Sequence, residues 1–277
     1  MDIEIIRKDE NSINFKVGGI SSAFANTLRR IIISEVPTMA IDEVVIIENS
    51  SVLHDEILAL RLGLIPLKTD LDSYNLPEEC ICKSEFGCNL CRSILTLDVE
   101  AENGVRTVYS GDLIPDDPDI VPVSDRIPIV KLASGQKVRL EAYTRLGRGK
   151  VHAKWQPVSM CVYRYMPIIN IDDDRCDACG ECVKFCPRDI LVNEDGQIKI
   201  QNLVECTLCK DCVNVCKKDP AAIEVNWDDK TFIFNIESTG VLPIERIVSE
   251  ALDILHKKIL DLLESVQVKE DESEEAD

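Results

Sequence analysis

Apolar residues recur at every second position on both sides of a polar turn at residues 9–12. These positions are Ile3, Ile5, Ile13, Phe15 and Val17. Successive side chains of a strand point to opposite faces of a sheet, so the alternation predicts a β-hairpin over residues 1–20. The same pattern predicts strands at residues 41–48, 95–99, 105–109 and 137–144.

Two turn signals predict further hairpins. Asn103-Gly104 stands between two of these strands, and Asn-Gly is a favoured two-residue hairpin turn. Residues 228–230 (Asp-Asp-Lys) separate two more alternating runs, at 225–227 and 232–236. We therefore expect one hairpin around each turn.

Three segments carry apolar residues three or four positions apart, as on one face of a helix. The first covers residues 21–35, where Ser21 or Ser22 can cap it, and the second covers residues 55–62. The third runs from Pro243 to about residue 266, with apolar residues at Ile244, Ile247, Val248, Ala251, Leu252, Leu255, Ile259, Leu262, Leu263 and Val266. Two interpretations of this long stripe stay open: a core helix of the chain, or a helix that packs on a partner subunit.

Eight cysteines in two matching runs carry the clearest chemistry. Each run has the spacing Cys-x2-Cys-x2-Cys-x3-Cys, and the runs are Cys176, Cys179, Cys182, Cys186 and Cys206, Cys209, Cys212, Cys216. This is the ligand pattern of a two-cluster bacterial-type ferredoxin, in which the last cysteine of each run binds the other cluster. We therefore assign Cys176, Cys179, Cys182 and Cys216 to one 4Fe-4S cluster, and Cys186, Cys206, Cys209 and Cys212 to the second.

The second run departs from the motif at one position. Pro187 follows the first run as the motif expects, whereas Lys217 follows the second. Structural zinc sites and disulfides are the alternatives, but the final x3 spacing fits zinc poorly. Iron–sulfur clusters imply a reducing, intracellular setting.

Four more cysteines, Cys80, Cys82, Cys88 and Cys91, lie in a loop with the ligand count of a structural zinc site. A disulfide pair and free thiols are the alternatives. Cys161 stands alone between apolar neighbours, and His54, His152 and His256 are scattered. Nothing in the sequence predicts catalytic residues.

Composition limits the function further. The chain has 277 residues, 45% of them hydrophobic, which allows two or three modest domains. Its net charge of −19 argues against a nucleic-acid-binding chain, which needs clustered Lys and Arg. The N-terminus resembles no signal peptide and no stretch has the length of a membrane span, so we expect a cytoplasmic protein. Residues 267–277 are rich in Glu and Asp, and we expect an acidic disordered tail there.

Four motifs resemble the α-like assembly subunits of DNA-directed RNA polymerase. Residues 19–37 (GISSAFANTLRRIIISEVP) are similar to their first helix, and residues 54–67 (HDEILALRLGLIPL) to their second signature. Residues 116–122 (DDPDIVP) and 145–155 (RLGRGKVHAKW) resemble the archaeal and eukaryotic branch. With the ferredoxin-like run, the chain looks like an archaeal member of this family, of the type that carries a ferredoxin insert.

The resemblance implies an α+β fold with a discontinuous architecture. Residues 1–48 and 225–266 would form a dimerisation domain, and residues 49–168 a mostly β domain with the cysteine loop at 80–91. Residues 169–224 would form an inserted ferredoxin-like 4Fe-4S domain. Eukaryotic relatives bind zinc in the cysteine loop, which favours zinc there.

The resemblance also implies partners. A small α-like polymerase subunit, subunit L, would pair with this chain, and the heterodimer would carry the large catalytic subunits. The predicted subunit interface comprises Phe24, Leu28, Arg29, Arg30, Ile247, Ala251, Leu255, Ile259 and Leu262. Two solvated arginines are the alternative for Arg29 and Arg30.

Three functions compete at this point. The first is a non-catalytic polymerase scaffold whose clusters are structural or regulatory. The second is a ferredoxin-type electron-transfer subunit of a redox complex, which the cysteine runs alone would favour. The third is a direct DNA-binding factor, for which the basic segment 145–155 is weak evidence in so acidic a chain. For that segment we prefer contact with a large polymerase subunit.

Overall fold

The structure is a computed structural model that describes residues 1–84 and 87–274, the last eight of these by their backbone alone. The chain forms two compact units. The first comprises Met1–Lys8, Ile13–Asn26 and Val162–Asn235, and the second Asp9–Ser12, Thr27–Cys161 and Ile236–Asp277. Each unit therefore combines segments that lie far apart in the sequence.

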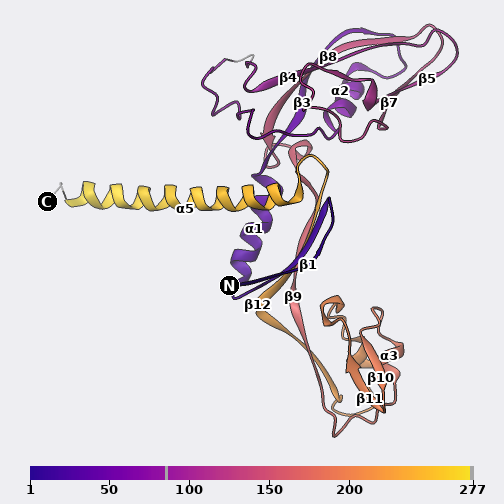
Figure 1. Cartoon of the computed structure of the whole chain (residues 1–277), viewed down its shortest axis with the longest axis vertical. Coiled ribbons are helices and arrows are strands. Elements are labelled where there is room, and N and C mark those ends of the chain that lie inside the picture. Colours follow the sequence, from indigo (N-terminus) through magenta and orange to yellow (C-terminus); the bar gives the residue numbers. More distant parts are fainter. Residues whose placement is uncertain (85–86, 275–277) are drawn as a thin grey trace. The chain divides into compact units, whose positions relative to one another are not determined.

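The first unit is built on a four-stranded sheet of order β1-β2-β12-β9 (Figure 1). Its strands are β1 (Asp2–Lys8), β2 (Ser12–Gly18), β12 (Ile223–Ser238) and β9 (Val158–Ile171). The predicted N-terminal hairpin is confirmed, with Ile3 opposite Val17 and Ile5 opposite Phe15. Phe15 stacks on Phe234 of β12 at 5.2 Å between ring centroids, so the alternation predicted from the sequence builds this core.

The second predicted hairpin of this unit is wrong. Residues 228–230 lie inside the single strand β12 instead of turning the chain. The Asp228 side chain accepts the backbone N–H of Lys230, and the Lys230 carbonyl accepts the N–H of Ile20. Polar residues without glycine or proline can therefore stay extended at a position where a neighbouring segment pairs with them.

A small subregion of the first unit carries the two cysteine runs. It contains α3 (Glu181–Lys184), the hairpin β10 (Leu191–Glu194) and β11 (Gln197–Ile200), the 3-10 turn η3 (Leu203–Glu205) and α4 (Asp211–Asn214). One hydrophobic cluster spans Ile169 to Val225, close to the predicted range 169–224.

The second unit is built on a sheet of order β3-β8-β4-β6. Its strands are β3 (Pro37–Asn49), β8 (Lys137–Arg148), β4 (Arg92–Glu100) and β6 (Ile114–Pro115), and a two-stranded sheet joins β5 (Arg106–Tyr109) to β7 (Pro128–Leu132). Helix α2 (Asp55–Gly63) buries Leu58 and Leu62 in the core of this unit. The 3-10 turns η1 (Ser110–Asp112) and η2 (Ala153–Trp155) complete the connections.

The hairpin predicted around Asn103-Gly104 is also wrong. The chain does turn there, and Gly104 has a φ of +76°, but β4 pairs with β8 and β5 pairs with β7. Strand partners depend on side-chain packing across the sheet, which a local turn signal does not contain.

Two boundaries of the predicted domains differ from the observed sheets. β3 covers all of residues 37–48, which we assigned to the dimerisation domain, yet it pairs with β8 from Pro37↔Arg148 to Asn49↔Val138. β9 includes residues 158–168, assigned to the β domain, but it belongs to the sheet of β12. The mixed helix and sheet content is confirmed, and most of the elements are strands.

Helices α1 (Ser22–Ser34) and α5 (Ile244–Glu274) are the two long helices predicted at the ends of the chain. The Ser21 hydroxyl caps α1 by accepting the N–H of Phe24 at 3.2 Å. The backbone of α5 is helical as far as Glu274; the disordered tail over residues 267–277 stays a prediction, and 275–277 lie outside the described residues. No Gly or Pro interrupts this acidic stretch, and Glu and Lys favour helix. Among the described residues, no helix is apolar enough over a sufficient length to cross a bilayer.

Candidate metal centres and pairing surface

The two cysteine runs fold in the same way. In each run, the residue before the second cysteine has a left-handed backbone, with φ of +50° at Ala178 and +57° at Leu208. Gly180 and Lys210, directly after that cysteine, are also left-handed and precede the short helices α3 and α4. Non-glycine residues rarely adopt this conformation, and such strain concentrates at functional sites.

The structure gathers the eight cysteines into two separate cavities. The four predicted for the first cluster line one cavity: Cys176, Cys179, Cys182 and Cys216. The four predicted for the second line the other: Cys186, Cys206, Cys209 and Cys212. The last cysteine of each run thus joins the opposite run, as the ferredoxin pattern predicts.

The surroundings of both cavities fit a cubane cluster held by thiolates. Apolar side chains line each one, among them Ile171 and Ile223 in the first and Leu191 and Val225 in the second. Backbone N–H groups approach cysteine sulfurs at 3.4 Å, from Leu208 to Cys206 and from Ala222 to Cys216. Burial raises the pKa of the Cys212 thiol to about 11, so a bound metal must supply the charge that stabilises its thiolate.

Charged side chains fasten the loops of both cavities. Lys218 pairs with Asp177 at 3.0 Å, and Lys217, at the position where the motif expects proline, lies 3.7 Å from Glu181. At the second cavity, the Arg164 guanidinium donates to the carbonyl of Cys206 at 2.5 Å. The Lys217 departure from the motif therefore gives the first site an ion pair across its two loops.

The four cysteines of the 80–91 loop also converge. Their Sγ atoms all lie within 4.8 Å of one another, and Cys80 and Cys91 are buried. The Cys80–Cys88, Cys82–Cys91 and Cys88–Cys91 separations are 3.7, 3.8 and 3.9 Å. Four thiolates around a tetrahedral zinc ion at about 2.3 Å lie about 3.8 Å apart, so this donor set fits zinc.

The thiols of this loop have unequal acidity. The backbone N–H of Ser84 lowers the pKa of Cys82 to about 7, and burial raises the pKa of Cys91 to about 12. Metal binding must displace the proton from Cys91 at neutral pH. Cys161 is buried elsewhere, and burial raises the pKa of its thiol to about 12, which suits a small core residue.

The long helix α5 changes character along its length. Ile247 and Ala251 are fully buried within the chain, Leu255 is half-buried, and Ile259 and Leu262 are 49% and 64% exposed. The core interpretation of the stripe is therefore confirmed for the first part of the helix, and the partner interpretation stays a prediction for its exposed part. Four more apolar side chains that the interface prediction omitted are exposed beyond Ala251: Leu252, Leu260, Leu263 and Val266.

The predicted interface residues of α1 divide in a similar way. Leu28 is buried, Phe24 and Arg29 are half-buried, and Arg30 is exposed. Leu28, like Ile247 and Ala251, belongs to the core of this chain, so these three positions are corrections to the predicted interface. Helical periodicity identifies an apolar stripe but does not say which part of it the chain itself covers.

The long basic side chains of the segment 145–155 form ion pairs within the chain. Arg145 and Lys154 both pair with Asp42, at 2.7 and 2.6 Å, and the remaining two long basic side chains, Arg148 and Lys150, pair with glutamates. Its two glycines allow close approach, since a Cβ on Gly147 would lie 2.4 Å from the Trp155 ring. Internal pairing accounts for these charges better than contact with a large subunit, and it leaves little positive charge for phosphates.

The DDPDIVP motif also has an internal role. Asp116 accepts the Ser93 hydroxyl at 2.5 Å and the N–H of Ile94, and Asp117 accepts the Tyr74 hydroxyl at 2.5 Å. These carboxylates fasten the segment after β6 to β4 and to the stretch before the cysteine loop.

Comparison with known proteins agrees with this architecture. The family model of the RNA polymerase Rpb3/Rpb11 dimerisation domain matches residues 14–259. The chain belongs to this family. It is 43% identical over 272 residues, 98% of its length and 100% of the relative's, to DNA-directed RNA polymerase subunit Rpo3 of Methanosphaera stadtmanae.

Two other relatives with the same name extend the likeness. Rpo3 of Archaeoglobus fulgidus is 42% identical over 93% of this chain and 94% of its own length. Rpo3 of Pyrococcus furiosus is 41% identical, again over 93% of this chain and 94% of its own length. The similarity thus extends over both compact units.

Proposed function

We propose that this chain is a non-catalytic assembly subunit of DNA-directed RNA polymerase that pairs with a small α-like subunit, subunit L. The observation that carries the proposal is the dimerisation-family match over residues 14–259 together with an apolar stripe on α5 that the chain leaves exposed. The names of the full-length relatives point to the same complex.

The exposed stripe of α5 is the surface we assign to pairing. Ile259, Leu262, Leu263 and Val266 are each about half exposed or more on one helix. Contiguous apolar surface on a soluble chain favours contact with another protein. A helix of the partner can pack along these residues, as apolar seams do in paired helices.

The other partners follow from the same assembly. The heterodimer would carry the large catalytic subunits, with exposed Arg30 of α1 as one contact, since arginine is enriched at protein interfaces. The paired basic side chains of residues 145–155 and the net charge of −19 support a chain that does not itself grip nucleic acid strongly.

We propose two 4Fe-4S clusters, bound by the two cysteine sets in the first unit, and zinc in the loop at 80–91. Bound clusters would stabilise the fold of residues 169–225, because ligand sites absent from an unfolded chain turn binding energy into folding energy. Such clusters require reducing conditions, and we place the protein in the cytoplasm.

An electron-transfer role is less well supported than the scaffold. The match to polymerase subunits extends over nearly the whole chain, well beyond the cysteine runs. The two roles differ in a measurable way: a scaffold supports transcription with intact clusters in either redox state, whereas a redox subunit loses turnover when its clusters cannot cycle.

The first experiment is anoxic purification of the tagged chain from its own cells, followed by identification of what accompanies it. Large polymerase subunits and a small α-like protein are the expected companions. Recovery of a flavoprotein or dehydrogenase in their place would contradict the scaffold.

A substitution then tests the pairing surface. Ile259→Asp should weaken pairing with the small subunit at least tenfold, because a charge buried at an apolar interface without a partner is costly. The matched control is Leu60→Asp, since Leu60 is 55% exposed on α2 and lies outside the stripe. Equal loss of pairing in both variants would contradict the assignment of the stripe.

A further inference from the structure

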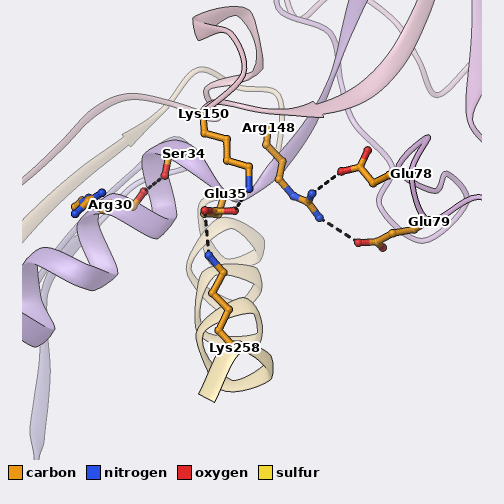
Figure 2. Close-up of polar contacts among 8 residues, drawn as sticks. All are labelled: Arg30, Ser34, Glu35, Glu78, Glu79, Arg148, Lys150 and Lys258. Atoms are coloured by element: carbon orange, nitrogen blue, oxygen red, sulfur yellow. Dashed lines mark hydrogen bonds and ion pairs between the residues drawn. The ribbon is translucent and has the colours of Figure 1, made fainter. Parts of the chain in front are cut away.

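A network of ion pairs joins α1, the end of β8 and α5 (Figure 2). Glu35 lies directly after α1 and accepts from two lysines, each at 3.0 Å: Lys150, just beyond β8, and Lys258 of α5. Its side chain is only 16% exposed. Burial alone would raise the pKa of Glu35, but the hydrogen bonds and charges of Lys258 and Lys150 hold it below its ordinary value, so the carboxylate stays charged.

The same turn reaches the cysteine loop. Arg148, two residues before Lys150, donates to Glu78 at 2.6 Å and to Glu79 at 3.1 Å (Figure 2). These glutamates directly precede Cys80, the first cysteine of the loop. Arg148 is therefore a positioning residue for the candidate metal site.

The turn that carries both basic residues is held firmly against α1. The N–H of Lys150 donates to the Ser34 carbonyl at 2.9 Å. A Cβ on Gly149 would lie 2.3 Å from the Ile33 carbonyl oxygen, so only glycine permits this approach. Arg148 and Lys150, whose ion pairs lie on the two sides of the turn, are therefore both held in place by the contact between this turn and α1.

A second connection runs directly from α5 to the segment before the loop. Arg246, near the start of α5, pairs with Asp72 at 2.8 Å. A cleft lies between α5 and this segment, and Glu35, Arg148 and Lys258 are among the residues that line it. Since the cleft is open, charge contacts and not close packing join the two elements here.

We propose that metal binding at the Cys80–Cys91 loop and pairing of α5 with the small subunit are coupled through Arg148, Lys150, Glu35 and Lys258. The coupling rests on the proposed function, because it requires a partner on α5. Lys258 stands beside Ile259 and one turn before Leu262, the exposed residues assigned to pairing. A partner that fixes α5 also fixes Lys258, which holds Glu35 and the Lys150 turn.

Coupling of this kind acts in both directions. Fixing the turn holds Glu78 and Glu79 in place and reduces the conformational entropy that the loop loses when four thiolates close on a metal. Thermodynamic linkage requires the metal to raise partner affinity by the same factor. We expect a factor of about five, at the lower end of typical couplings between sites, since the ion pairs are partly exposed.

The test is a complete binding cycle with the full-length, cluster-loaded chain and the purified small subunit. Zinc affinity is measured by chelator competition in the chain alone and in the heterodimer, and partner affinity is measured with the loop zinc-loaded and zinc-free. The expected result is a rise of about fivefold in both affinities. Arg148→Gln and Lys258→Gln, at opposite ends of the network, should each bring the factor close to one.

Arg139→Gln is the matched control, because Arg139 pairs with Asp98 in the same unit outside the network. It should leave the coupling factor unchanged, and thermal unfolding checks that all variants fold. Equal zinc affinity in chain and heterodimer would overturn the coupling while leaving the scaffold intact. A coupling factor that stays near five in both Arg148→Gln and Lys258→Gln would show that these ion pairs do not carry the coupling. A small subunit that does not bind at all would overturn the proposed function, and this proposal with it.

Discussion

The two cysteine-rich regions of this chain use their cysteines differently. In residues 169–225 the hydrophobic cluster includes six of the eight cysteines, and the other two, Cys179 and Cys209, are exposed. The loop at 80–91 instead belongs to the second unit, whose large hydrophobic cluster contains no cysteine among its described buried residues. In one region the cysteines are part of the hydrophobic cluster, whereas in the other they lie in a loop outside it.

The difference teaches where a metal contributes to folding. A short region with few buried aliphatic residues cannot offset its conformational entropy by apolar burial alone. A sheet that buries many Leu, Ile and Val side chains can offset this entropy without a metal. We therefore expect metal loss to unfold the first region and to loosen only the loop in the second.

The largest expected effect is removal of cluster ligands from the first region. Replacing Cys206 and Cys209 together with Ser should destabilise residues 169–225 by about 5 kcal/mol or more, as loss of a metal site does. Hydrogen exchange should show lost protection there, and assembly with the large subunits should weaken. Pairing with the small subunit should persist. Collapse of pairing as well would show that the two functions do not divide as proposed.

An intermediate effect is expected in the core of the second unit. Leu97 of β4 is 1% exposed, and Leu97→Ala should cost about 2–5 kcal/mol through lost burial and a cavity. Cys91→Ser, which disables the loop site, should cost less than Leu97→Ala and remove amide protection only near residues 80–91. Urea unfolding of both variants measures the difference. A larger loss of unfolding free energy from Cys91→Ser than from Leu97→Ala would contradict the view that metal loss only loosens the loop in the second unit.

The smallest effect concerns pH. The native pKa of Glu35 lies below its ordinary value of 4.5, so its stabilisation is fully present above that value and is lost as pH falls through the native pKa. Glu35→Gln should therefore cost about 1 kcal/mol at neutral pH, and the cost should shrink below about pH 4.5. Urea unfolding followed by Trp155 fluorescence, in a Trp227→Phe background, reports on the second unit. A cost independent of pH would mean that charge is not the cause.

Local patterns predicted the elements whose causes are local. The N-terminal hairpin and α1 with its Ser21 cap follow from alternation, helical spacing and a side-chain hydrogen bond to the next turn. The assignment of Cys216 and Cys186 to opposite cavities also followed from the sequence, because in the two-cluster ferredoxin pattern the last cysteine of each run binds the other cluster.

Pairing between distant segments could not be predicted in this way. Asn103-Gly104 makes a turn, yet the strands beside it belong to different sheets, and residues 228–230 are as polar as a turn but lie within β12. The partners of β3 and β9 likewise depended on which faces meet in space.

The sequence by itself determined the two cysteine sets and the helices at both ends, because each depends on spacing along the chain, and its motifs carried the resemblance to the polymerase family. Only the tertiary structure decided that Ile247 is core while Ile259 is exposed, and that Arg148 and Lys150 face glutamates of the same chain. Burial and ion pairing depend on neighbours that are distant in sequence, and the periodicity of apolar residues contains no information about those neighbours.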